Sequence, residues 1–348
     1  MKPINDTGFF RSFFPLVIAG FLFCSPVQAF TFKIATVSPN SSAWMKGMRV
    51  RAAEIATATD GRVKFKFYPG GVMGDDKAIL RKMRVGQLHG GAVASSSLTN
   101  IMTDVQLYGL PMVFRDFAEV DYVRSRMDAG LAQRLEQKGY VVFGFPEVGF
   151  ARAMSIKPIT SVDHARNSRV WIPDNDPGSA QGIAAFEITP IPLTIVDVLP
   201  GLQTDLIDAV AIPPVGALTL QWHTQLKYIT DLPLLYIYGI FTVSKKSFSK
   251  ISYEDQKVVR DILSEHAGVV DGLTRKDNAS AYQALLNQGL QATSPSNKEI
   301  NEWRGLAAGA VQELVRTGTV TKSAYQTLLA HLAEFRASVS PKVDTVVE

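Results

Sequence analysis

Two short blocks, residues 67–76 and 201–210, constrain the fold of this chain more than any other feature. The first reads Phe-Tyr-Pro-Gly-Gly-Val-Met-Gly-Asp-Asp and the second Gly-Leu-Gln-Thr-Asp-Leu-Ile-Asp-Ala-Val. In each block, turn-forming residues separate a strand-like stretch from a helix-like one, which is typical of strand–helix junctions in α/β domains. The blocks are more than a hundred residues apart. They therefore predict two lobes, with room for a small molecule between them.

The rest of the mature chain alternates between the two periodicities. Apolar residues at every second position predict strands at 30–35 and 63–67, and helical spacing follows each of them. Residues 90–95 are small and apolar, which favours a buried strand. Further strands are expected at 141–145, 151–155, 169–172 and 207–211. Strands that alternate with helices in this way predict open α/β sheets.

Residues Tyr253–Gln288 have the pattern of one long helix. Ser252 and Asp255 form a capping pair, Gly289 gives a stop signal, and no proline lies between them. At 1.5 Å per residue, the run would be roughly 50 Å long, which is longer than one lobe is wide. We therefore expect this helix to contact both lobes.

Residues 1–29 have the pattern of an export signal. Lys2 and Arg11 form the basic start, Ser12–Cys24 is almost continuously apolar, and small residues precede a cleavage point before Phe30. The apolar stretch is shorter than the about 20 residues that a membrane helix needs. The sequence thus predicts a cleaved signal peptide and a mature protein in the periplasm of a Gram-negative bacterium.

Composition argues against several classes of function. The only cysteine, Cys24, lies in the predicted signal, so we expect no disulfide and no thiol chemistry in the mature chain. Loss of Lys2, Arg11 and Asp6 lowers the formal charge from +4 to +3, and the basic residues are scattered, which argues against nucleic acid binding. The five histidines lack metal-ligand spacing, and no acid–base or nucleophile set converges. We therefore expect no cofactor, no metal and no enzymatic activity.

Nine short motifs occur in a fixed order along the mature chain. They are Gly61-Arg62-Val63, Tyr68-Pro69-Gly70, Gly74-Asp75-Asp76, Gly86-Gln87-Leu88, Leu110-Pro111 with Phe114, Gly149-Phe150, Lys157-Pro158-Ile159, Leu202-Gln203-Thr204 and Lys227-Tyr228. Together, over essentially the whole mature chain, they resemble the extracytoplasmic solute receptors of tripartite ATP-independent periplasmic (TRAP) transporters.

The resemblance implies an α/β fold with two lobes, joined by hinge strands and crossed by a long helix. We expect residues 30–148 with 238–276 in the first lobe and 149–237 with 277–345 in the second. The family also implies that a small organic solute is enclosed between the lobes and that closure presents a surface to TRAP permease membrane subunits. The residues expected around the solute are Thr36, Trp44, Tyr68, Asp76, Arg152, Trp171, Asp174, Ile195 and Ile212.

The chain departs from the family where many relatives hold a ligand carboxylate. The family's Arg-Val-Pro motif corresponds here to residues 171–173, which places Trp171 at the position of the clamping arginine. A second common arginine corresponds to Ala151, and Arg152 follows one place later, where a regular strand would turn it to the opposite face. The family's asparagine and an aromatic position correspond to Ile212 and Ile195.

These departures predict a largely apolar or aromatic solute, neutral or cationic. Trp171 would stack on it, and Asp76 or Asp174 would supply a polar contact. The rival hypothesis is an ordinary carboxylate, held by Arg152 from a bulged strand.

Each of these residues also has a purely structural interpretation. Trp171 could belong to the core of a sheet, Asp76 could simply begin a helix, and Arg152 could form a surface ion pair. Function likewise has an alternative, because the same fold could report solute binding to a membrane kinase as a sensing adaptor.

Overall fold

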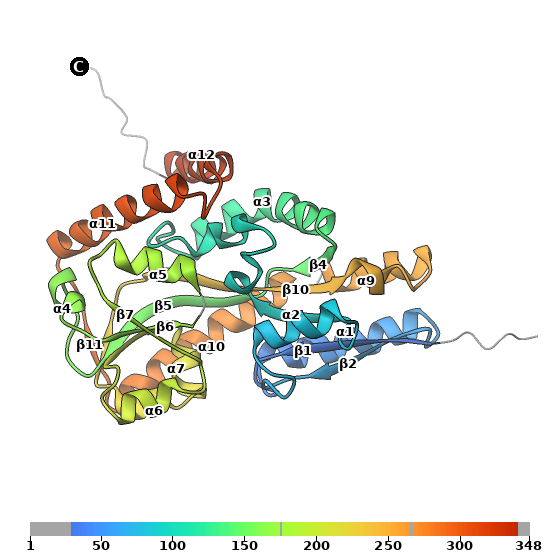
Figure 1. Cartoon of the computed structure of the whole chain (residues 1–348), viewed down its shortest axis with the longest axis horizontal. Helices are drawn as coiled ribbons and strands as arrows, with labels where there is room; N and C mark the ends of the chain where they lie inside the picture. The colour runs from blue at the N-terminus through green and yellow to red at the C-terminus, as the bar shows by residue number, and fades with distance from the viewer. Residues whose placement is uncertain (1–28, 175, 265–266, 340–348) are drawn as a thin grey trace, which may run out of the picture.

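The computed structural model describes residues 29–174, 176–264 and 267–339, so almost all of the predicted signal peptide lies outside it. The protein is a mixed α/β structure with two lobes side by side (Figure 1). Eleven strands of the described chain form one curled sheet, whose main path has the order β2-β1-β3-β10-β5-β8-β6-β7. The α/β class and the two-lobed architecture predicted from the sequence are confirmed.

The first lobe is built on three parallel strands, as its alternating pattern predicts. Its elements are β1 (Phe30–Thr36), α1 (Ala43–Ala58), β2 (Val63–Tyr68), α2 (Asp76–Arg84), β3 (Gly90–Ala94), the 3₁₀ helices η1 (Ser95–Leu98) and η2 (Thr103–Gly109), α3 (Phe117–Gln137) and β4 (Tyr140–Gly144). Ser42 and Asp75 begin α1 and α2 by accepting hydrogen bonds from the backbone N–H groups of Met45 and Ala78.

The second lobe repeats the pattern with shorter strands. Its elements are α4 (Val162–Arg166), β6 (Val170–Pro173), α5 (Pro177–Ala184), β7 (Pro190–Leu193), α6 (Val198–Gln203), β8 (Ala209–Ile212), α7 (Pro214–Thr219), η3 (Trp222–Gln225), β9 (Tyr228–Thr230) and β11 (Gln291–Thr293). Strand β6 lies between β7 and β8 and pairs with both in parallel.

Two antiparallel strands, β5 (Glu147–Ser155) and β10 (Leu235–Ser244), join the lobes. One end of β10 pairs with β3, and its other end pairs with the start of β5, whose far end pairs with β8. The pairing between β5 and β10 shifts register between Ile237 and Tyr238. Opposite this shift, Gly149 has a φ of +122°, a conformation that side-chain-bearing residues rarely adopt.

The structure describes the predicted long helix as two helical stretches, α9 and α10, on either side of residues 265 and 266. Helix α9 (Tyr253–Ser264) packs on α1 and β4, whereas α10 (Ala267–Asn287) packs on α1, on β5 and on α7 of the second lobe. Residues 265 and 266, between the two helices, lie outside the described part of the chain. The helix that spans both lobes is therefore α10, and it runs below the joining strands in Figure 1.

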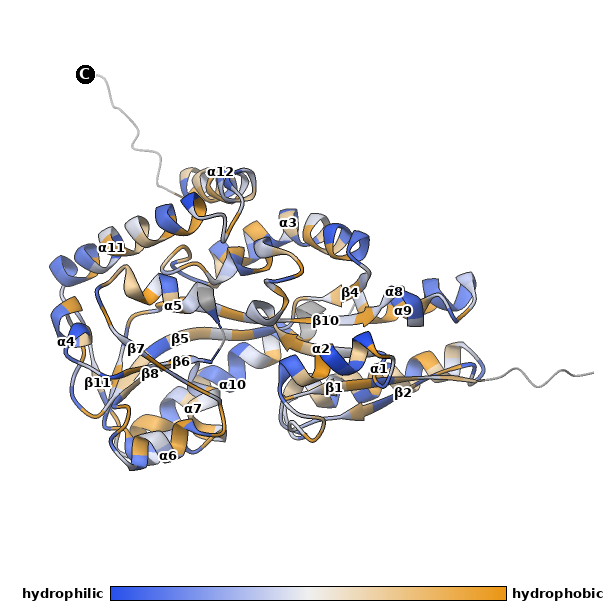
Figure 2. Ribbon diagram, viewed as in Figure 1, coloured by the Kyte–Doolittle hydropathy of each residue, from blue (hydrophilic) through white to orange (hydrophobic). Residues whose placement is uncertain are grey.

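The two C-terminal helices, α11 (Asn297–Arg316) and α12 (Lys322–Val339), lie against different parts of the protein. Helix α11 contacts α4 and α5, and α12 contacts α3 and η2. The sequence-based ranges place α12 in the second lobe, although α3 and η2 fall in the first. The lobe ranges as a whole stay a prediction. Both helices show polar and apolar faces, as expected for elements that cover a core (Figure 2).

A buried polar network lies where the joining strands, α3 and α10 meet. Arg124 of α3 donates hydrogen bonds to the hydroxyl of Tyr236 at 2.8 Å, to Asp271 Oδ2 at 3.0 Å and to the carbonyl of Phe145 at 2.7 Å. The other carboxylate oxygen of Asp271 accepts a hydrogen bond from the backbone N–H of Glu147 at 3.0 Å. This network fixes the first part of α10 to α3 and to the start of β5.

Substitution of Gly90, on β3 of the first lobe, would test how tightly the sheet is packed. A Cβ atom there would lie 2.5 Å from the carbonyl oxygen of Thr242 and 2.6 Å from a methyl group of Val243. We predict that Gly90→Ala lowers the free energy of unfolding by about 3 kcal/mol. Gly130→Ala, on the exposed face of α3 with open space around it, should instead raise it by roughly 0.5–1 kcal/mol. Urea unfolding of the two variants measures both changes, and equal stability of the two would contradict the packing described here.

Candidate functional site

Several of the predicted solute residues lie on parallel strands or directly after them. Thr36 and Tyr68 end β1 and β2, and these strands are parallel, so their carboxyl ends share one edge. In the second lobe, Trp171 and Ile212 lie on parallel strands β6 and β8, and Ile195 follows β7. Open α/β sheets bind ligands outside such carboxyl ends. The convergence of all these residues on one solute stays a prediction.

Asp76 is the most distinctive charged group at the edge of the first lobe. It is the first residue of α2, and its Oδ2 accepts hydrogen bonds from the backbone N–H of Ala94 at 2.8 Å and from the hydroxyl of Ser97 at 3.0 Å. Its other oxygen, Oδ1, is enclosed and has no hydrogen-bond partner among the described residues. Burial raises the pKa of the Asp76 carboxyl, and the two hydrogen bonds oppose that rise. The carboxylate thus keeps one unused acceptor.

Thr36 and Tyr68 support the same edge. Thr36 is buried; its hydroxyl accepts a hydrogen bond from the N–H of Ser38 at 3.1 Å and its carbonyl accepts one from Gly71 at 3.1 Å. These bonds hold the turn after β2 against the end of β1. Tyr68 is half-buried, with the ammonium group of Lys66 5.5 Å from its ring centroid.

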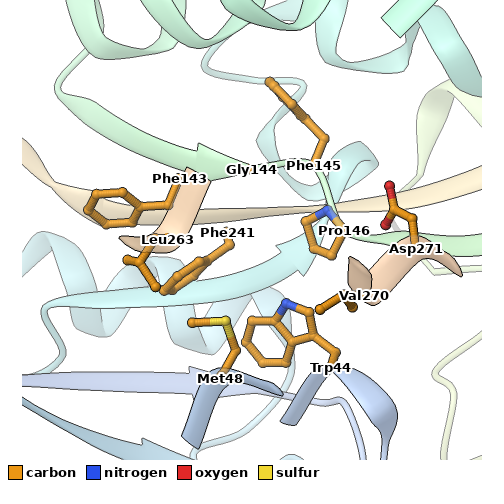
Figure 3. Close-up of a pocket in the computed structure, with 10 residues that line it drawn as sticks. All are labelled: Trp44, Met48, Phe143, Gly144, Phe145, Pro146, Phe241, Leu263, Val270 and Asp271. Atoms are coloured by element: carbon orange, nitrogen blue, oxygen red, sulfur yellow. The ribbon is translucent and has the colours of Figure 1, made fainter. Parts of the chain in front are cut away.

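Trp44 belongs to the core of the first lobe. Its ring packs edge-on against Phe241, with 5.6 Å between centroids, and it lines a cavity of about 30 Å³ together with Met48, Leu263 and Val270 (Figure 3). A cavity of this size holds a water molecule or two and no organic solute. This cavity therefore gives no support to the predicted contact between Trp44 and the solute, which stays a prediction.

Trp171 lies in the apolar core of the second lobe, where it is 7% exposed. Its indole N–H donates a hydrogen bond to the carbonyl of Leu193 at 3.0 Å, and its ring meets Trp222 edge-on with 5.1 Å between centroids. Ile212 is buried in the same cluster and packs on Gly216 of α7. This environment agrees with the sheet-core interpretation of Trp171, and stacking of Trp171 on a solute stays a prediction.

Arg152 already has a partner. Its guanidinium forms an ion pair with Asp231 and lies 5.3 Å from the ring centroid of Tyr282 on α10. The irregular pairing of β5 lies before this position, opposite Ile237 and Tyr238, and β5 pairs regularly with β8 from Arg152 onward. A solute carboxylate could reach this guanidinium only in competition with Asp231.

Asp174 and Ile195 lie in the turns that follow β6 and β7. The backbone N–H of Asp174 donates a hydrogen bond to the carbonyl of Leu193 at 3.1 Å, which joins the two turns. Ile195 is 41% exposed and is followed by exposed Val196. These turns therefore present both a carboxylate and apolar surface beside the strand ends.

Comparison with known protein families shows which family this chain belongs to. The sequence model of one family, bacterial extracellular solute-binding protein, family 7, matches residues 34–317. This chain belongs to that family.

Similar proteins confirm the predicted resemblance to TRAP receptors. The solute-binding protein is 21% identical over 243 residues to the 2,3-diketo-L-gulonate-binding periplasmic protein YiaO of Escherichia coli, covering 69% of this chain and 74% of YiaO. Its fold matches the sugar acid binding protein DctPAm of Advenella mimigardefordensis, solved with galactonate, with a TM-score of 0.81, 18% identity and coverage of 88% and 99% of the two chains. A TRAP periplasmic solute binding protein of Desulfovibrio salexigens, solved with orotic acid, matches with a TM-score of 0.80, 17% identity and coverage of 89% and 100%.

Two further properties concern the described residues alone. None of their helices is both long and apolar enough to cross a membrane. Their His, Cys, Asp and Glu side chains form no group of three or more that could hold a metal ion.

Sequence reasoning missed several groups of the solute-binding protein that the structure places beside the predicted residues. Ser97 bonds to Asp76, Asp231 pairs with Arg152, and the carbonyl of Leu193 accepts from Trp171. The run of serines at 95–97, directly after a buried strand, was a signal for the first of these. No local pattern indicates Asp231, because it lies 79 residues from Arg152.

The raised pKa of Asp76 predicts a measurable pH dependence. A folded-state pKa above the unfolded value of about 3.8 means that the folded protein holds this proton more tightly. The stability that the carboxyl contributes is therefore greatest below the unfolded pKa, and it is lost as the pH rises through the folded pKa. Asp76→Asn cannot lose a proton, so we predict that its stability relative to wild type increases from pH 4 to pH 7, as followed by urea unfolding.

Asp75→Asn is the matched control for this prediction. It removes the same charge from the neighbouring residue, and asparagine still caps α2 well. This variant keeps the buried Asp76 carboxyl, so we expect Asp76→Asn to show the larger change in stability with pH. A flat pH profile for Asp76→Asn would show that burial of this carboxyl has no energetic consequence.

Proposed function

We propose that this protein is a periplasmic receptor that captures a small organic solute between its lobes and delivers it to a TRAP-type membrane permease. The observation that carries the proposal is the family match over residues 34–317. The structure of this chain matches nearly the full length of two proteins that were solved with bound solutes, which supports a receptor fold. The strand ends of both lobes supply the walls of the expected site.

We further propose that the solute is largely apolar or aromatic, and neutral or cationic. A carboxylate enclosed between lobes needs a positive or multi-donor partner, because an unpaired buried charge is very costly. Trp171, Ala151 and Ile212 occupy the positions where the resemblance would place polar anchors. Arg152, which follows Ala151 in the sequence, forms an ion pair with Asp231.

Asp76 is the polar anchor in this proposal. Its free Oδ1 can accept a hydrogen bond from a hydroxyl or ammonium group of the solute, while Ala94 and Ser97 hold Oδ2 in place. A donor from the solute would also remove the cost of leaving a buried acceptor unpaired. Asp174 could add a second contact from the other lobe.

The rival solute is an ordinary small acid, and the relatives give it weight. YiaO, DctPAm and the Desulfovibrio protein are named or solved with 2,3-diketo-L-gulonate, galactonate and orotic acid, respectively. In that case Arg152 would exchange Asp231 for the carboxylate of the solute. Binding of an aromatic or apolar solute would depend on Trp171, whereas binding of a carboxylate would depend on Arg152.

A thermal-shift screen of the purified mature protein against a metabolite library identifies the solute. A ligand at 100 times its dissociation constant adds about 2.7 kcal/mol of stability, which raises the melting temperature by several degrees in a domain of this size. We expect hits among aromatic or apolar neutral and cationic compounds. If the protein binds no metabolite and its gene lies near no permease, the receptor function is wrong.

Variants of the two candidate residues separate the rival solutes. We predict that Trp171→Ala weakens binding of the screened solute at least tenfold, because it removes the aromatic wall, whereas Arg152→Ala leaves binding within a factor of three. Trp171→Phe, which keeps a ring, guards against loss of fold in the alanine variant. Arg169→Ala, which breaks a similar exposed ion pair with Asp208, is the control for Arg152→Ala. Calorimetric titration that shows tight binding of a C4-dicarboxylate, abolished only in Arg152→Ala, would establish the rival.

A further inference from the structure

A groove of about 210 Å³ lies between α11, α12 and the loop formed by residues 111–115. Its apolar lining includes Leu329, which is 40% exposed, half-buried Tyr325, and the buried residues Val311 and Leu332. Val311 and Leu332 belong to the core around α3, whereas neighbouring Ala307 belongs to a separate core beneath α4 and β6. The groove thus lies where two apolar cores meet at the surface.

Three arginines line this apolar groove: Arg115, Arg304 and Arg336. Arg336 is tied to Glu119 through two hydrogen bonds, of 2.7 and 2.9 Å. The guanidinium groups of Arg115 and Arg304 are on exposed residues, and no described residue forms a hydrogen bond or ion pair with either of them. Two positive charges are therefore available beside an apolar surface.

The α11 side of the groove is open to a ligand. Ala308 lines the groove and is exposed, and no atom lies within 4 Å of a Cβ built at Gly305 or Gly309. Ala308 carries only a methyl group, so it leaves this side of the groove open.

We propose that this groove binds an organic anion with a short apolar body, such as a medium-chain or aryl carboxylate. The carboxylate would pair with Arg115 and Arg304, and the body would lie on exposed Leu329 and half-buried Tyr325. The volume is below the roughly 300–1,000 Å³ of drug-sized sites, which limits the ligand to about ten non-hydrogen atoms. A ligand of this size binds with a dissociation constant on the order of 0.1–1 mM.

This site is separate from the proposed solute site. In Figure 1, α11 and α12 lie at the top of the view, with the joining strands β5 and β10 below them and helices α6 and α7 at the opposite side. The groove contains none of the residues predicted to contact the solute. Its occupation therefore does not depend on whether the protein is a solute receptor.

Octanoate is the probe for this site, with octyltrimethylammonium as the probe of opposite charge. We expect calorimetric titration of the mature protein to show octanoate binding and methyl NMR to show shifts at Leu329 and Ala308. The double variant Arg115→Glu and Arg304→Glu should weaken octanoate at least tenfold by reversing both charges. Ala308→Trp, which fills the groove from an exposed position, should weaken it as well.

Two control variants make the result specific. Lys298→Glu reverses one charge on α11 outside the groove, half the charge change of the double variant, and should leave octanoate binding unchanged. Asp76→Asn alters the proposed solute site and should also leave it unchanged, so failure of one proposal is distinguishable from failure of the other. The groove proposal is overturned if octanoate does not bind at roughly millimolar concentration, if octyltrimethylammonium binds equally well, or if the shifted methyl groups are those of Ile212 and its neighbours.

Discussion

The guanidinium of Arg124 holds together the part of the protein where the two lobes meet. It contacts α3, the joining strand β10 and helix α10 at once, through Asp128, Tyr236 and Asp271. A charge this deeply buried is stable only while every partner is in place, because losing one leaves another charge unpaired. The network therefore fixes the relative positions of elements that lie more than a hundred residues apart in the chain.

A second arginine, Arg275, fixes the next part of α10 to the same elements. Arg275 binds Glu147, whose side chain is fully buried, and reaches Asp121 of α3 at 2.6 Å. One turn later, Asn278 bonds instead to the carbonyl of Val148 and to the N–H of Val215 in the second lobe. The contacts of α10 thus change from one lobe to the other within a single turn of helix.

The two lobes would contribute different kinds of contact to the proposed solute site: a charged group from the first lobe and apolar side chains from the second. The first lobe contributes Asp76, with one oxygen bonded and one free, whereas the second contributes the apolar cluster of Trp171 and Ile212. Arg152, the anchor in the rival hypothesis, forms an ion pair with Asp231. A receptor with these walls would select a solute by apolar contact first and by one hydrogen bond second.

The sequence by itself determined the local elements, the two-lobed α/β class and the family, because periodicity and turn residues such as those at 67–76 act over short distances. It predicted helix over 253–288, where the described residues from 253 to 287 are helical, but it gave no indication that α12 packs on α3. Only the tertiary structure decided that Arg152 pairs with Asp231 and that Trp171 lies in a core. Both outcomes depend on contacts between residues far apart in the chain, which sequence spacing does not encode.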